Sequence, residues 1–334
     1  MNRGDDAAGH AALFPNGEAA RALAVETDSM LDERIVYLNG DFVKWQQAAV
    51  HMMSHSFGRG SAVFEVLSVH ETDRGPCVFR LDRHLERLFR TAELLNMTLP
   101  ISPEALSAAC LQTVSRNGIR QGFIKVICYY GQVAFDILPP EGPMDVAVFA
   151  LDPAADLEKS PFYSENGVSA AFSSWRKLDP QTIPVEAKAA ANYLNGMLAR
   201  NDARRRGFDL VILLDTQGFV AEGATEAVFM VENGVLHTAC PGTVLLSITR
   251  RSLLEAAASL GIETREERMH PDRLLSAAEV FFAGTPSKVL PINQIEDRRI
   301  DAAPGPVTRR LSALMHEIVS GRRQPFNDWL FPVR

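Results

Sequence analysis

Apolar and polar residues alternate along several short stretches in the first part of the chain. Residues 34–45 contain two such stretches on either side of Asn39-Gly40, a dipeptide that favours hairpin turns. The pattern predicts a further strand over 61–70 and a hairpin partner for it over 75–81.

Helical periodicity follows these strands. Between positions 82 and 97 the apolar residues recur every three or four positions, as on one face of a helix. They are Leu85, Leu88, Phe89, Ala92 and Leu95. Asp82 is the expected N-cap of this helix. A second helix is predicted over 102–118, with Ser102 as its cap and Pro103 at its first position.

Strands and helices continue to mix in the rest of the chain. We predict strands over 122–131, 144–151, 167–175, 210–215, 219–223, 226–239 and 277–292, and helices over 192–207 and 249–261. A turn at Asn233-Gly234 divides the strand region 226–239. Because no regular strand–helix–strand repeat is present, the expected fold class is α+β with largely antiparallel sheets.

The length of 334 residues is long for one core and suits two domains. We expect residues 1–33, which have weak periodicity, to form a mobile tail. A small domain is predicted over 34–150 and a large domain over 151–334. The proline-rich segment 137–144 is a candidate loop between them.

Composition narrows the functional classes. A net charge of −7 argues against a nucleic-acid binder, which usually has a basic face. No apolar run approaches the roughly 20 residues of a membrane helix, and the first residues do not resemble a signal peptide. The four cysteines lie far apart without a C-x-x-C motif. We therefore expect reduced thiols in a cytoplasmic protein.

The segment TIPVEAKAAANYLNG, residues 182–196, places Lys188 among four alanines. The chain uses lysine sparingly, with six lysines against 28 arginines. Lysine can lose its proton and attack a carbonyl, whereas arginine stays charged. Lys188 is therefore a candidate nucleophile, although a lysine on a helix can also simply extend its amine into water.

Other short motifs are weak when taken singly. His51 and His55 are four residues apart but lack the glutamate and third ligand of a zinc motif, so we predict no metal site. Residues 58–61 suggest a tight turn between two strands. Ser247 and Thr249 suggest helix capping, and the free N–H groups of such a helix start are also a possible phosphate site.

Taken together, six motifs in order resemble the fold-type IV pyridoxal-phosphate aminotransferases. That family includes branched-chain and D-amino-acid aminotransferases and aminodeoxychorismate lyase. The branched-chain pattern matches Val63-Phe64-Glu65, Phe79 to Leu88, Thr182 to Leu194, Glu222-Gly223, Ile248-Thr249-Arg250 and Gly284-Thr285. The resemblance runs from about Arg34 to the final helix and implies a two-domain fold with the cofactor in the large domain.

The resemblance also implies roles for individual residues. Lys188 would bond to pyridoxal 5'-phosphate and then move the substrate's α-proton. Glu222 would pair with the pyridine nitrogen. Tyr193 would bind near the phenolic oxygen of the cofactor. The residues that would hold the phosphate are Arg87, Ile248, Thr249 and Thr285. The family works by a ping-pong reaction between an amino donor and a keto acid, in homodimers that share their active sites.

The substrate side departs from the branched-chain pattern. Arg59 stands where a tyrosine is usual, and Val66 where a glycine is usual. A carboxylate-binding tyrosine is replaced by Phe123, and a pocket arginine by Lys125. Pro286 removes an N–H that helps hold the substrate carboxylate.

With Phe64, these five residues form the predicted substrate pocket. A branched-chain aminotransferase is favoured, a D-amino-acid or (R)-amine transaminase and an aminodeoxychorismate lyase-like enzyme are alternatives, and a non-catalytic relative is disfavoured.

Overall fold

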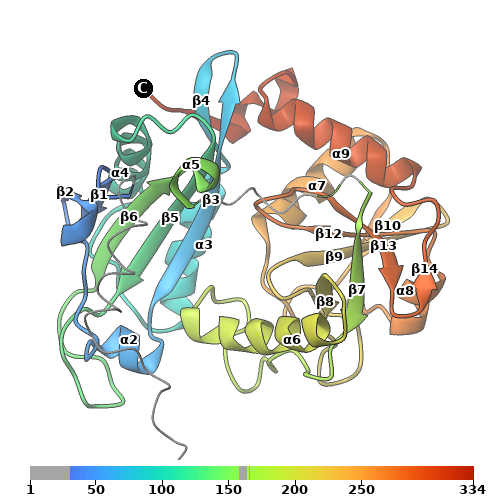
Figure 1. The fold of residues 1–334 in the computed structure, drawn as a ribbon, viewed down its shortest axis with the longest axis horizontal. Helices are drawn as coiled ribbons and strands as arrows, with labels where there is room; N and C mark the ends of the chain where they lie inside the picture. The colour runs from blue at the N-terminus through green and yellow to red at the C-terminus, as the bar shows by residue number, and fades with distance from the viewer. Residues whose placement is uncertain (1–30, 158–163, 165) are drawn as a thin grey trace, which may run out of the picture.

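The computed structural model describes residues 31–157, 164 and 166–334. Two sheets lie side by side, the first formed mainly by the N-terminal half of the chain and the second by the C-terminal half (Figure 1). The predicted tail 1–33 lies outside the described residues except for its last three. Those three form a turn in which Leu31 is buried.

The first sheet is antiparallel throughout and has the strand order β15-β4-β3-β5-β6-β1-β2. Its strands are β1 (Ile35–Leu38), β2 (Asp41–Lys44), β3 (Val63–Thr72), β4 (Gly75–Phe79), β5 (Gly122–Tyr129), β6 (Asp145–Leu151) and β15 (Leu330–Pro332). The predicted hairpin at Asn39-Gly40 is confirmed, and both residues have the positive φ that its turn requires. β15 comes from the end of the chain, so the first sheet is completed by a C-terminal segment. The division at residue 150 stays a prediction.

Two helices cover one face of this sheet, α3 (Leu81–Leu94) and α4 (Pro103–Arg116). Alternate residues of β3 and β5, such as Leu67 and Ile124, pack under these helices in a fully buried core. The opposite face therefore carries the other alternation of side chains toward the second sheet.

The second sheet is mixed, in the order β11-β10-β9-β12-β13-β7-β8 with β14 paired to β13. Its strands are β7 (Val168–Phe172), β8 (Leu210–Ile212), β9 (Ala227–Glu232), β10 (Val235–Thr238), β11 (Thr264–Glu266), β12 (Glu279–Ala283), β13 (Leu290–Ile295) and β14 (Arg298–Arg299). Three neighbouring pairs are parallel and the others antiparallel. The expected α+β class is confirmed.

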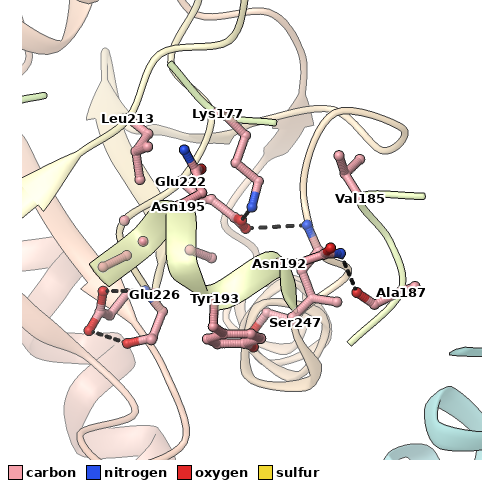
Figure 2. Close-up of a pocket in the computed structure, with 16 residues that line it drawn as sticks. Lys177, Val185, Ala187, Asn192, Tyr193, Asn195, Leu213, Glu222, Glu226 and Ser247 are labelled. Atoms are coloured by element: carbon pink, nitrogen blue, oxygen red, sulfur yellow. Dashed lines mark hydrogen bonds and ion pairs between the residues drawn. The ribbon is translucent and has the colours of Figure 1, made fainter. Parts of the chain in front are cut away.

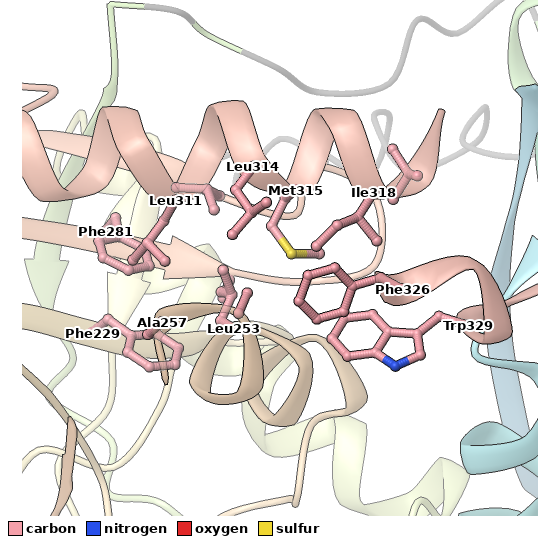
Figure 3. Close-up of a cluster of buried hydrophobic side chains, with 14 of the residues drawn as sticks. Phe229, Leu253, Ala257, Phe281, Leu311, Leu314, Met315, Ile318, Phe326 and Trp329 are labelled. Atoms are coloured by element: carbon pink, nitrogen blue, oxygen red, sulfur yellow. The ribbon is translucent and has the colours of Figure 1, made fainter. Parts of the chain in front are cut away.

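Of the remaining helices, the first two along the chain lie beside the first sheet and the other four pack around the second (Figure 1). They are α2 (His55–Arg59), α5 (Pro153–Leu157), α6 (Tyr193–Arg205), α7 (Ile248–Ser259), α8 (Pro271–Ser276) and α9 (Pro306–Val319). Three short 3-10 helices, η1 (Trp45–Gln47), η2 (Ala190–Asn192) and η3 (Gln324–Trp329), complete the described elements. Figure 3 shows the core where α7 and α9 close over Phe229 and Phe281, whose rings stack 5.0 Å apart.

Three local predictions are wrong. Asp82 lies in the first turn of α3, and the N-cap is Arg80, which has a left-handed backbone. Tertiary contacts fix that start, because the Arg80 N–H donates to the Trp329 carbonyl and the guanidinium lies 4.3 Å from the centre of the Trp329 ring. Residues 58–61 are not a turn between strands, since α2 ends there with Gly60 at φ +71°. The segment 137–144 joins β5 to β6, which are neighbours in one sheet, and so is not a loop between domains.

Candidate active site

Lys188 lies where the two sheets meet. Its carbonyl accepts a hydrogen bond from the N–H of Phe64 at 3.1 Å, so the lysine segment pairs with the start of β3. Its own N–H donates to the Thr91 hydroxyl on α3 at 3.1 Å. These two bonds fix the backbone of the lysine segment to the first sheet, while α6 leads directly from it across the second sheet.

The side chain of Lys188 is buried among aromatic rings. Its Nζ donates to the Tyr193 hydroxyl at 2.5 Å and lies 4.7 Å from the centre of the Phe64 ring. Burial, followed by the nearby charge of Arg87, lowers the pKa of Lys188 to about 8. A substantial fraction of the amine is therefore neutral near physiological pH, as a nucleophile or a base requires.

Arg87 is held by a buried carboxylate. Its Nε and Nη2 donate to the two oxygens of Glu65 at 2.7 and 2.8 Å, and His84 Nδ1 lies 2.7 Å from the same carboxylate. Burial alone would raise the pKa of Glu65, but Arg87 and His84 outweigh it and lower that pKa to about 2. Burial opposes the charge of Arg87 as well, yet Glu65 raises its pKa. The cluster thus presents a permanently charged guanidinium to the site.

The start of α7 meets Arg87. The Arg87 Nη1 donates to the Leu246 carbonyl at 3.0 Å, one residue before the cap. Ser247 caps the helix through its hydroxyl, and Ile248 and Thr249 are buried in its first turn. A cation and the N–H end of a twelve-residue helix therefore converge, a combination that favours an anion.

Glu222 lies on a small cavity between α6 and the second sheet. Its carboxylate pairs with Lys177 Nζ at 2.5 Å and accepts from the Leu245 N–H at 3.2 Å. Figure 2 shows Lys177 and Glu222 pointing toward one another at the cavity that Tyr193 also lines. The other lining residues are mainly small, and include Ala187, Gly196, Gly223 and Ala224.

The predicted substrate residues divide between a sheet face, a turn and the helix α2. Phe64, Val66, Phe123 and Lys125 lie on the same face of β3 and β5, because Val66 is opposite Lys125 in the antiparallel register. The Phe64 ring has Lys125 Nζ 5.5 Å from its centre, in addition to Lys188.

Two further predicted substrate residues lie outside this face. Pro286 is exposed in the turn between β12 and β13, next to Thr285, whose hydroxyl lies 3.5 Å from the Val66 carbonyl. Arg59 is exposed on α2. Its guanidinium donates hydrogen bonds to the carbonyls of Phe135 and Asp136, in the segment that joins β5 to β6.

The residues that sequence reasoning missed are those whose partners are distant in the chain. Glu65 and His84 stand inside the recognised motifs, but their function of holding Arg87 needs the fold. Lys177 and Lys288 are also buried or nearly so. The scarcity of lysine that singled out Lys188 would have found both.

The described residues contain no group of three or more histidine, cysteine or acidic side chains arranged for a metal ion. The His55 ring bonds the Ser61 hydroxyl and the Ile137 carbonyl, and His51 accepts from the Met53 N–H. No helix of the described chain is long and apolar enough to cross a membrane.

This arrangement of two sheets, a lysine of lowered pKa between them and an anion site beside it defines a pyridoxal-phosphate enzyme of fold type IV. The sequence profile of the family described as amino-transferase class IV matches residues 62–295. The chain belongs to this family and is a pyridoxal-phosphate-dependent aminotransferase.

Relatives of known name and solved structures match this chain along nearly its whole length. A branched-chain-amino-acid aminotransferase of Salmonella typhimurium is 34% identical over 301 residues, which cover 89% of this chain and 97% of that protein. The crystal structure of the T.th. branched-chain amino acid aminotransferase complexed with N-(5'-phosphopyridoxyl)-L-glutamate has 35% identity and a TM-score of 0.85, with 90% of this chain and 99% of that chain covered. The branched-chain aminotransferase of Thermoproteus uzoniensis with norvaline has 33% identity and a TM-score of 0.86, with the same coverage.

Proposed function

We propose that this aminotransferase moves the amino group of branched-chain L-amino acids to a 2-keto acid in a ping-pong reaction. The observation that carries the proposal is the apolar sheet face beside Lys188 Nζ, formed by Phe64, Val66 and Phe123. An aliphatic side chain buried there gains roughly 0.8 kcal/mol for each methylene removed from water. The relatives of similar length named above are branched-chain enzymes, which supports the same choice.

The residues fit the cofactor. Three of the five N–H donors of Arg87 are used by Glu65 and Leu246, so two remain for a phosphate. Ile248, Thr249 and Thr285 would complete the phosphate site. Glu222 would bind the ring nitrogen, since a carboxylate can accept a third donor beside Lys177 and the Leu245 N–H. Tyr193 would bind the phenolic oxygen from its place on the cavity.

Lys188 would hold the cofactor and move the proton. When bound, pyridoxal phosphate supplies an aldehyde carbon for amines and an electron-withdrawing ring. In its neutral form the Lys188 amine would hold the cofactor, and as a free base it would take the α-proton of the substrate. The Tyr193 hydroxyl, 2.5 Å from Nζ, orients the amine.

The substrate carboxylate needs a cation, because Phe123 and Pro286 offer no donor to it. Lys125 is the cation on the apolar face, and its Nζ lies near Phe64 on the side of the sheet that carries Lys188. We assign the carboxylate to Lys125. Arg59 is less suited, because two carbonyls of the 131–138 loop already hold its guanidinium.

A D-amino-acid or (R)-amine transaminase is the second candidate. Val66 adds a side chain to the face next to Phe64, where the branched-chain pattern has glycine, and Pro286 has no N–H for a carboxylate. Both changes lie at the proposed substrate site and are the observations that favour this candidate.

A half-reaction screen tests the choice of substrate. Holoenzyme is mixed separately with L-leucine, L-isoleucine, L-valine, D-alanine and an (R)-amine. The decrease in the absorbance band of the bound cofactor is recorded for each. We expect the three L-amino acids to react. Reaction of D-alanine or the amine alone would replace the proposal by the second candidate, and pyruvate release from aminodeoxychorismate without a keto acid would indicate the lyase.

We also propose a homodimer with shared active sites. The helix α2 and the two loops beside it carry a group of large apolar side chains that are between 39% and 80% exposed: Val50, Met52, Met53, Phe57, Val133, Phe135, Ile137 and Leu138. A cluster of this size is unusual on a monomer and marks an interaction surface. It adjoins the site, because Ala62 of the same region pairs with Ala190 beside Lys188.

Light scattering tests the dimer. Phe135→Asp places a charge in the exposed cluster and should shift the protein toward monomer with loss of turnover. Leu157→Asp, on the exposed side of α5, is the matched control and should remain dimeric. A wild-type monomer with full activity would contradict the proposal.

We further propose a cytoplasmic location. All four cysteines lie in the described part of the chain and are free, three of them buried. Burial raises the pKa of both Cys110 and Cys128 to about 12, so these thiols stay protonated and inert. Fractionation of cells that express the tagged protein tests this location, and recovery in an oxidising compartment would contradict it.

A further inference from the structure

Lys288 is a buried lysine that the proposed chemistry does not use. It lies in the turn between β12 and β13, with 7% of its surface exposed. None of the carboxylates in the described ranges lies within ion-pair distance of its amine. Burial lowers the pKa of Lys288 to about 7. A buried amine without an ionic partner is unfavourable for folding, so its presence calls for a local reason.

The backbone at Lys288 is also unfavourable. Its φ of +56° lies in the left-handed region, which a lysine rarely adopts. Such a conformation persists where surrounding contacts impose it, and these positions gather at functional sites. Here the backbone N–H of Lys288 donates to the Gly284 carbonyl at 2.9 Å and closes the turn 284–288.

The amine of Lys288 joins the two sheets. Its Nζ donates to the Ser68 hydroxyl on β3 at 2.7 Å and to the Thr285 carbonyl of its own turn at 2.7 Å. His70 Nε2 lies 2.8 Å from the same Ser68 hydroxyl, so Ser68 can donate to His70 while it accepts from Lys288. The ring centre of Phe79, on β4, is 4.9 Å from Nζ. Ser68 and Phe79 belong to the first sheet, and the turn belongs to the second.

The turn that Lys288 holds borders the proposed substrate site. It contains Thr285 and Pro286, and Ser68 follows Val66 by two residues on the same face of β3. The direct contact between the turn and this part of β3 is long, 3.5 Å from the Thr285 hydroxyl to the Val66 carbonyl. The bond from Lys288 to the Ser68 hydroxyl is shorter, at 2.7 Å, and is therefore the stronger link between the turn and β3.

We propose that Lys288 is a positioning residue that links the turn 284–287 to β3 and thereby fixes the wall of the substrate site formed by Thr285 and Pro286. The inference rests on the proposed function, because that function places the substrate between this turn and Val66. Lys288 acts through the turn and does not touch the reacting atoms.

Substitutions of Lys288 and Ser68, the two residues that form the link, test this proposal in the holoenzyme. Lys288→Met keeps the length of the side chain and removes both hydrogen bonds, whereas Ser68→Ala removes one of the two. Lys44→Met, on the exposed strand β2, is the matched control. Three quantities are compared: amide hydrogen exchange in peptides that cover 283–289, KM and kcat for the best amino donor, and the melting temperature.

For Lys288→Met we expect exchange in 284–288 and KM to rise about tenfold each, with kcat within about twofold of wild type. For Ser68→Ala we expect about a threefold rise in both, because the bond to β3 is lost while the bond from Lys288 to the Thr285 carbonyl still closes the turn. The melting temperature of Lys288→Met should stay within about 2 °C of wild type or rise, since the substitution also removes a buried unpaired amine. Lys44→Met should match wild type.

Unchanged exchange and KM in Lys288→Met would overturn the proposal. So would a lower melting temperature with faster exchange throughout the protein, because that result shows general destabilisation. If wild-type enzyme transfers no amino group from any donor, the proposed function fails. The exchange measurement then still decides whether Lys288 holds the turn.

Discussion

Replacement of Glu65 by glutamine tests the electrostatic basis of the cofactor site. Glu65 is completely buried and accepts from Arg87 and His84. The pKa of Glu65 is 4.5 in the unfolded chain and about 2 in the folded protein. Folding is therefore about 3 kcal/mol more favourable with Glu65 as the carboxylate than with Glu65 as the neutral acid. Glutamine resembles the neutral acid and leaves Arg87 without its counter-charge, so Glu65→Gln should lower the free energy of unfolding by about that amount.

The sign of the pH dependence follows from the lowered pKa. The stabilisation by Glu65 is fully present above pH 4.5, the ordinary pKa of its carboxyl group, and is lost as the pH falls toward 2. Urea unfolding of wild type and Glu65→Gln should therefore differ by about 3 kcal/mol at pH 7, and the difference should shrink below about pH 4.5.

Glu86→Gln, on the exposed side of α3, is the control and should change the free energy of unfolding by less than about 0.5 kcal/mol. A loss below about 1 kcal/mol in Glu65→Gln at pH 7 would refute the reasoning, as would a difference between wild type and Glu65→Gln that persists unchanged to about pH 2.

Three further predictions concern the amine, the Lys177 pair and the core. The rate of pyridoxal-phosphate capture by apoprotein should rise with pH and reach half its maximum at about pH 8, because the neutral form of the Lys188 amine would bind the cofactor. Stopped-flow absorbance measures this rate, and a midpoint at about pH 10 would contradict the prediction. Lys177→Met should destabilise the apoprotein by about 1 to 3 kcal/mol and the holoprotein by less, because the N–H of the cofactor ring would replace the lost donor to Glu222. Calorimetry measures both losses, and equal losses in the two forms would contradict the prediction. Phe281→Ala, which removes a fully buried ring stacked on Phe229, should lower the free energy of unfolding by about 3 to 5 kcal/mol, and a loss under about 1 kcal/mol would contradict the packing.

Local chemistry explains which parts of the fold could be predicted from sequence. The turns at Asn39-Gly40 and Asn233-Gly234 were predictable, because Asn-Gly adopts the positive φ values that tight hairpins need. Ser102 was predictable as a cap because its hydroxyl bonds the N–H of Ala105, three residues on. These signals depend only on residues close in the chain.

Contacts between distant residues explain the failures. The N-cap of α3 is Arg80 and not Asp82, because Trp329 and Glu255 hold Arg80 from more than 170 positions away. Membership of β15 in the first sheet has no local signal either, since Leu330 pairs with Phe79 only in the folded chain.

The candidate site divides in the same way. The residues proposed to bind the cofactor could be predicted through motifs, and the structure brings Lys188, Tyr193 and Arg87 close together. The groups that support these residues could not be predicted from the sequence. The hydrogen bonds from Arg87 to Glu65 and from Lys288 to Ser68 join elements that no motif connects. The scarcity of lysine was one sequence signal that pointed toward Lys288.

We propose that the Lys188 amine forms the covalent bond to pyridoxal phosphate. Borohydride reduction of the holoenzyme followed by peptide mapping locates that bond directly. We predict the label on the peptide that contains Lys188 and its loss in Lys188→Ala. A label on Lys177, on Lys288 or on no lysine would contradict the account.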